Sequence, residues 1–318
     1  MSHMKSKQGQ NRAWQALVGA VALGIGGVAL AEPVEIKPNF QIGSEYQQRM
    51  TMEQDIEQTV MGNPMNIAMD MMFDMTTTVA EHPDDGVFRL QIVYDRVEAE
   101  VDGPMGPGRW ASGDPQPMNP MLMGFAAMDG MTLSYDYSVD GDVTNLEGTE
   151  AILDKSLAGV PQAMRAQMRE MFEGQFGKEQ MTEMIKAGHG IYPDRPVSVG
   201  DAWNQSLEIG GMMPMLADST YELKDVSGNQ ATVDVNGILE TTDDAAMAVG
   251  PGMEAEMQMQ GTQDGQLTYN LDTGWIEAIQ LQQTIDGELT MANPGNPEGP
   301  PMVIPMKVSS TIQVELID

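Results

Sequence analysis

Cysteine is absent from the 318-residue sequence, and only three histidines are present: His3, His82 and His189. Without cysteine the chain can form no disulfide, no thiolate nucleophile and no cysteine-ligated zinc or iron–sulfur site. The sequence also lacks the G-x-S-x-G, H-E-x-x-H and phosphate-loop motifs of hydrolases, metalloproteases and nucleotide-binding proteins. His82 and His189 lie beside proline or glycine and are expected in solvated turns. We therefore expect no cofactor and no catalytic residues, and keep a hydrolase of unrecognised type as a third alternative.

Positive charge is scarce in this chain. Lys and Arg number 16 against 47 Asp and Glu, which gives a formal net charge of -31 and an isoelectric point near 4.1. A groove that follows the phosphate backbone of DNA or RNA needs clustered positive charge. The composition therefore excludes nucleic acid as the expected partner.

The N-terminal 31 residues have the pattern of a secretory signal peptide. Lys5, Lys7 and Arg12 precede an uncharged run over residues 13–31, which ends in a small-x-small triplet. A basic start, an apolar centre and such a triplet are the features that export and cleavage require. A retained membrane anchor is the alternative, but glycine and alanine make the run weakly hydrophobic. We expect cleavage after Ala31, a periplasmic or secreted protein, and no stable membrane insertion afterwards.

Alternating apolar and polar residues dominate the chain from Phe40 onward. Residues 88–94 and 312–316 show this alternation, which is typical of antiparallel strands with one buried and one solvated face. Asp-Gly and Gly-Asn pairs between such runs are hairpin signals. Segments 103–131 and 293–301 are rich in proline, glycine and methionine, and are expected to be long loops.

Between the alternating runs, apolar residues recur at the three- and four-residue spacing of helices. The predicted organisation is a first β segment over residues 32–148, a helical insertion over 149–190 and a second β segment over 191–318. The predicted fold is mainly β, with two similar curved antiparallel sheets, half-barrel-like in form, and an α-helical insertion.

Three short motifs resemble those of a known family. They are the stretch Tyr192–Trp203, which reads Y-P-D-R-P-V-S-V-G-D-A-W, the early Gly43–Tyr46, and a hairpin with Tyr135 five residues before Asp140-Gly141. Together they resemble a family of uncharacterised exported bacterial proteins over Pro38–Asp318. The resemblance implies export and a β-rich fold, and it supplies no catalytic residues. A more distant likeness, in architecture only, is to periplasmic lipoprotein carriers.

Methionine is unusually frequent, with 31 residues. Some methionines share one face of an alternating segment, as in a packed core, yet the flexible thioether also suits a lining for ligands of variable shape. Others crowd Pro/Gly-rich segments, where we favour a lid over an apolar pocket. The predicted ligand-binding residues are Met69, Met71, Phe73, Met75, Met118, Met121, Met123, Met212, Met213 and Met215.

The function predicted from these patterns is an exported, non-catalytic binding or envelope-maintenance protein. Its partner would be a hydrophobic small molecule, such as a lipid or an acyl chain, or an apolar peptide, held in a methionine-lined concavity. Thioethers also bind Cu(I) and Ag(I), and exposed methionine is oxidised reversibly. A metal or oxidant buffer is therefore the alternative function.

One segment has the spacing of a calcium loop. Oxygen side chains stand at the first, third, fifth and twelfth positions, a glycine at the sixth and an apolar residue at the eighth, as in an EF-hand. The residues preceding the segment alternate like a strand, whereas an EF-hand needs a helix there. Calcium is therefore a minor hypothesis, and its candidate ligands are Asp136, Ser138, Asp140, Asp142 and Glu147.

Overall fold

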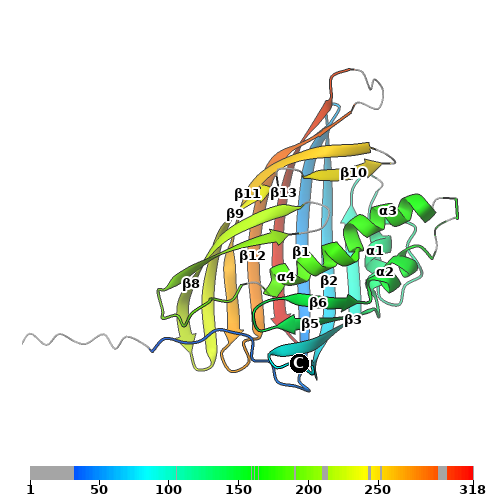
Figure 1. Cartoon of the computed structure of the whole chain (residues 1–318). Helices are drawn as coiled ribbons and strands as arrows, with labels where there is room; N and C mark the ends of the chain where they lie inside the picture. Colours follow the sequence, from blue (N-terminus) through cyan, green and yellow to red (C-terminus); the bar gives the residue numbers. More distant parts are fainter. Residues whose placement is uncertain are drawn as a thin grey trace, which may run out of the picture. The chain divides into compact units, whose positions relative to one another are not determined.

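Long antiparallel strands dominate the structure, so the mainly β prediction is confirmed (Figure 1). In this computed structural model, Glu32–Asp318 forms one compact unit. The residues that the structure describes are 32–104, 106–158, 160, 162–163, 165–189, 191–209, 214–242, 245–250, 253–292 and 299–317. The predicted signal peptide lies outside the described residues.

The first half of the chain forms a meander in which each strand pairs with its neighbour in sequence. Its strands are β1 (Glu45–Val60), β2 (Asn63–Glu81), β3 (Val87–Asp102), β5 (Thr132–Ser138) and β6 (Val143–Glu147), with the short β4 (Gly108–Ala111) paired to β3.

The second half repeats this arrangement. Its strands are β7 (Ala202–Ile209), β8 (Met215–Ser227), β9 (Gln230–Thr241), β11 (Met253–Asn270), β12 (Ile276–Met291) and β13 (Met302–Leu316), with β10 (Ala246–Gly250) paired to β11.

The two halves are joined into one sheet of 13 strands, which corrects the prediction of two sheets. The connection is the antiparallel pairing of β1 with β13, from Gln48 opposite Leu316 to Gln58 opposite Met306. Both strands alternate an apolar face with a polar face, so pairing them continues one buried face across both halves. The edges of the sheet are then β6 and β7.

Among the described residues, four helices accompany the sheet: α1 (Pro120–Met128), α2 (Thr149–Ser156), α3 (Arg165–Phe176) and α4 (Lys178–His189). Helices α2, α3 and α4 form the chain between the edge strands β6 and β7. Helix α4 contacts both of these edges. A helix over an edge hides backbone groups that would otherwise pair with another chain. No helix in the described residues has both the length and the apolarity needed to cross a membrane.

Helix α1 and strand β4 correct the prediction of a loop over residues 103–131. The side chain of Asn119 accepts a hydrogen bond from the backbone N–H of Met121, and Pro120 occupies the first turn of the helix. Asparagine is a strong N-cap, and proline has no N–H to leave unpaired at that position. The helix is apolar on most sides because it is packed into the core, so it shows no amphipathic spacing.

Buried apolar residues form three clusters on the inner face of the sheet. One joins β2, β3 and β5 to the helices, and includes Phe73, Leu90 and Phe172. A second, which is rich in methionine, lies on β8, β9, β11, β12 and β13, and a third lies on β7, β8, β9 and β11. The second and third clusters lie at different levels along the same strands, and the residues between them form part of the candidate site.

Candidate functional site

The central strands carry apolar side chains that the protein does not bury completely. Those of β2, β12 and β13 point to the inner face because they are in phase with buried residues of the same strands. Met50 and Met52 of β1 do so because they lie directly opposite the buried Phe73 and Met71 of β2. We call this set the central inner surface, and its members, all half-buried, are Met50, Met52, Ile67, Met69, Ile279, Leu281, Ile312 and Val314.

The central inner surface is continuous across four neighbouring strands. Met52 lies opposite both Met71 on β2 and Ile312 on β13, and Ile312 in turn lies opposite Leu281 on β12. Side chains directly opposite each other on one face of an antiparallel sheet are within contact distance. Apolar residues in the middle of a packed sheet face are usually fully buried. Their partial exposure here leaves an apolar surface accessible inside the curve of the sheet.

A row of polar and small residues crosses the same inner face. We call it the polar row, and its members, in the order of the strands, are Gln54 (β1), Ser310 (β13), Gln283 (β12), Gln263 (β11), Gly237 (β9), Ser219 (β8) and Gln205 (β7). Each member is the direct cross-strand partner of the next. The row therefore separates two apolar regions of one surface.

Hydrogen bonds link several members of the polar row. The amide of Gln54 donates to the hydroxyl of Ser310 at 3.2 Å, and that of Gln283 donates to the side-chain carbonyl of Gln263 at 3.0 Å. Gln263 donates in turn to Ser219 at 2.7 Å. Gln263, Ser219 and Ser310 are buried, whereas Gln54 and Gln283 are half-buried. The two half-buried amides lie in the central strands, beside the accessible apolar surface.

The end of helix α4 is held by buried tyrosines. The hydroxyl of Tyr135 lies 2.8 Å from Nε2 of His189, and the rings of Tyr137 and His189 lie 4.4 Å apart. Burial lowers the pKa of His189 to about 4 and raises the pKa of both tyrosines. At neutral pH His189 is therefore uncharged. The expectation of a solvated turn was wrong, because the last residue of α4 packs against β5.

The stability of the folded protein is expected to fall as the pH drops from about 6.5 to about 4. In this window the unfolded chain binds a proton at His189 that the folded protein excludes, so unfolding is favoured at lower pH. The H189Q variant should show a flatter dependence of the unfolding free energy on pH over the same window. Urea titrations at pH 7, 5.5 and 4.5 would measure this, and an unchanged slope in the variant would contradict it.

The predicted methionines are distributed over several surfaces. On β2, Met69 belongs to the central inner surface, Met71 and Phe73 are buried in the first core cluster, and Met75 is half-buried against that cluster. The fold therefore places these four side chains on one face.

The methionines assigned to a lid do not lie on a common loop. Met118 is 96% exposed, whereas Met121 and Met123 belong to helix α1, and Met123 is buried. Met215 is the first residue of β8 and is buried in the methionine-rich cluster. The last two predicted residues, Met212 and Met213, lie outside the described residues.

The calcium-loop candidates lie in the β5–β6 hairpin, and a cation of the protein already pairs with two of them. Arg89 donates to the buried Asp136 at 2.9 Å and to Glu147 at 2.6 Å. Asn145 also donates to Asp136, at 2.6 Å. Asp136 lies on strand β5, where an EF-hand has a helix. Within the described residues, no group of three or more His, Asp and Glu side chains has the geometry of a metal site.

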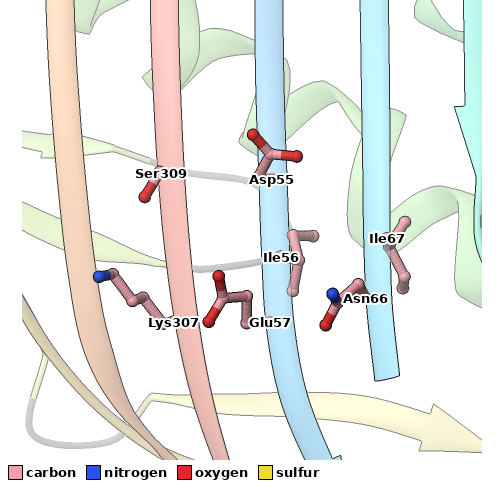
Figure 2. Close-up of a pocket in the computed structure, with 7 residues that line it drawn as sticks. All are labelled: Asp55, Ile56, Glu57, Asn66, Ile67, Lys307 and Ser309. Atoms are coloured by element: carbon pink, nitrogen blue, oxygen red, sulfur yellow. The ribbon is translucent and has the colours of Figure 1, made fainter. Parts of the chain in front are cut away.

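A shallow hollow of about 320 Å³ lies over β1, β2 and β13 (Figure 2). Asp55, Glu57 and Lys307 line it, and they alternate with the inner-facing residues of their strands. Five of its seven lining residues therefore face outward, and the other two, Ile56 and Ile67, belong to the inner-facing set of their strands. Its lining is mostly polar and charged, unlike the apolar pockets that hold most organic ligands.

Comparison with protein families gives one match. A family model described as Family of unknown function (DUF6263) covers residues 85–276, which is more than half of the chain. The chain belongs to this family. Membership in a family of unknown function agrees with the sequence resemblance, whereas export and the motif-based span Pro38–Asp318 stay predictions. Among curated proteins, none is similar in sequence.

Solved structures with similarity to the chain include three that each align with 88% of it. One is a structure of lipid–protein interactions in lipovitellin, at 12% identity and a TM-score of 0.47, of whose chain this protein spans only 26%. The others are the COG4313 outer membrane channel from Pseudomonas putida F1 and the outer membrane protein OprG from Pseudomonas aeruginosa. Both are 7% identical and are covered over 98% of their chains, with TM-scores of 0.26 and 0.23.

The region shared with the DUF6263 family covers only part of the candidate site. It runs from just before β3 to Ile276, the first residue of β12, and so includes Gln205, Ser219 and Gln263 of the polar row. It leaves out β1, β2 and β13, which carry most of the central inner surface. All eight members of the central inner surface therefore lie outside the matched region.

Proposed function

We propose that the protein is an exported, non-catalytic binding protein that holds a hydrophobic ligand against the central inner surface. The observation that carries this proposal is the partial exposure of apolar side chains in the middle of an otherwise buried sheet face. Covering this surface would remove apolar area from water, which is favourable by about 25 cal/mol per Å². Three of its members, Met50, Met52 and Met69, have the flexible side chains that adapt to ligands of different shapes.

Export is the second part of the proposal, and the basic and apolar leader over residues 1–31 supports it. The full chain, expressed with this leader in a bacterial host, should be recovered from the periplasmic fraction with Glu32 as its first residue. A full-length product confined to the cytoplasm would contradict this part and leave ligand binding unaffected.

Ligand binding is tested by filling the central inner surface. The I312W variant should lower the affinity for the uncharged fluorescent probe N-phenyl-1-naphthylamine by tenfold or more, because the larger ring occupies the space that the probe would use. Gln313, the next residue on β13, is exposed on the outer face, so Q313W is the matched control and should bind like wild type. Fluorescence titration measures both affinities. A wild-type protein that does not bind the probe, or equal losses in both variants, would overturn the proposal.

A further inference from the structure

The polar row divides the central inner surface in a way that restricts its ligand. On one side of the row the half-buried Ile56 and Ile67 lie opposite each other on β1 and β2. The neighbouring Val308 and Ile285 are buried. On the other side Met52, Ile312 and Leu281 lie opposite one another on β1, β13 and β12. Along the strands, the surface is therefore apolar, then polar at the row, then apolar again. A ligand that matches it has a hydrogen-bonding group between two apolar parts.

The inner faces of the three central strands are uncharged. Every charged side chain of β1 and β13 falls at an outward position, as Glu53 and Lys307 do, and the inner positions hold apolar residues, glutamine, serine and one tyrosine. On β12, Asp286 and Glu288 alternate with inner-facing Ile285 and Leu289. Glu277 lies at the register shift where β12 begins, and it accepts hydrogen bonds from Gln230 and Asn270. Moving an ionised group into such a surface without a partner of opposite charge is strongly unfavourable. The ligand should therefore be neutral.

Two side-chain amides of the polar row have donor and acceptor groups that are not used within the protein. A glutamine side chain has two N–H donors and an oxygen that accepts two hydrogen bonds. Gln54 and Gln283 each use one donor, toward Ser310 and Gln263. Within the described residues, neither side-chain oxygen of these two glutamines accepts a hydrogen bond, and both residues are half-buried. A ligand carbonyl or hydroxyl placed at the row could therefore be bound without breaking the existing bonds.

From this arrangement we propose that the ligand is a neutral lipid with ester and hydroxyl groups between its apolar parts, and that Gln54 and Gln283 bind those groups. This inference rests on the proposed function, and adds to it the chemical class of the ligand. One acyl chain would lie against Met52, Ile312 and Leu281, and the other against Ile56 and Ile67. The ester carbonyls would accept hydrogen bonds from the unused amide N–H groups. An ionised fatty acid lacks the neutrality that the surface requires, and a plain hydrocarbon lacks acceptors for the amides.

The experiment compares three lipids as competitors of N-phenyl-1-naphthylamine: diolein, the hydrocarbon squalene, and oleate at pH 8. Wild-type protein should release the probe at a diolein concentration about tenfold lower than that needed with squalene or oleate. The Q54M and Q283M variants keep the shape of the side chain and remove its amide. Each should lose most of the preference for diolein over squalene, measured within each variant as the ratio of the two competing concentrations, because one hydrogen bond is worth about tenfold in affinity at most.

Gln282 faces outward beside Gln283, so Q282M is the matched control and should keep the preference. Variants that retain the diolein preference while binding the probe would show that the row only links strands, and would overturn this inference alone. A wild-type preference for oleate or squalene would overturn it as well. Failure of the wild-type protein to bind any probe or lipid would instead reject the proposed function. Near-ultraviolet circular dichroism of each variant confirms that the fold is intact, and Q54M and Q283M provide two independent tests.

Discussion

Adding one methyl group at Gly265 is expected to lower the free energy of unfolding by about 3 kcal/mol or more. Gly265 lies on β11 at an inner-facing position between β9 and β12. A Cβ atom there would overlap the backbone carbonyl oxygen of Gln280 and lie 2.9 Å from Cα of Leu281. Backbone atoms of paired strands cannot move aside without breaking ladder hydrogen bonds, so the G265A variant must distort the sheet.

Urea unfolding followed by circular dichroism would measure this loss. Gly188 of helix α4 is the matched control, because a Cβ atom at that position has no neighbouring atom within 4 Å. Alanine is favoured over glycine inside helices, so G188A should raise stability by up to about 1 kcal/mol. If the two variants unfold at the same urea concentration, β11 and β12 do not approach as closely at Gly265 as these distances indicate.

Replacing Arg89 by methionine is expected to lower the free energy of unfolding by about 3 kcal/mol at pH 7. Asp136 is only 5% exposed, and its partners are Arg89, Asn145 and, at 3.6 Å, Nε2 of His82. The R89M variant would leave the carboxylate buried without the guanidinium that pairs with it. In contrast, Arg96 is 55% exposed and pairs with Glu98 on the surface, so R96M should cost less than about 1 kcal/mol.

The effect of R89M should also depend on pH. Burial alone would raise the pKa of Asp136, but hydrogen bonds from Asn145 and Arg89 outweigh it and lower the pKa. The stabilisation from the ionised carboxylate is present above the unfolded-state pKa, about 3.9, and is lost as the pH falls through the lower folded-state value. In R89M the pKa of Asp136 rises, so the difference between variant and wild type should shrink toward pH 3. Unfolding titrations at pH 7 and pH 3 measure the difference in unfolding free energy between R89M and wild type. An equal difference at both pH values would contradict a stabilising pair between Arg89 and Asp136.

The sequence predicted the class of the fold because alternation is a local property. Residues such as Ile312 and Val314 signal a strand with one apolar face whatever strand lies beside them. The partner of a strand is not local information, so the pairing of β1 with β13 was missed and one sheet was predicted as two. Helix α1 was missed for another reason, since a helix buried on most sides has no amphipathic spacing to detect.

The polar row is visible in the sequence as amide residues at positions where the alternation calls for an apolar residue. Gln283 is in phase with the apolar Leu281 and Ile285, and Gln54 is in phase with Met52. An amide at an apolar phase position on a strand predicts either a buried hydrogen bond or a binding surface. Only the register of the strands shows that the exceptions on separate strands form one row. The methionine pattern, in contrast, indicated the correct face of β2 without indicating which residues stay accessible.

The pairing of the first strand with the last has a consequence for how the protein folds. Gln54 and Ser310, hydrogen-bonded across β1 and β13, are 256 residues apart in sequence. Contacts between such distant segments close large loops and slow folding. Until β13 is available, the free edge of β1 can pair with other chains, as unprotected strand edges do. If the chain crosses a membrane with its N-terminus first, the first half must wait for the last fifteen or so residues before its edge is covered. Chaperones that bind extended strands would then determine the yield of folded protein.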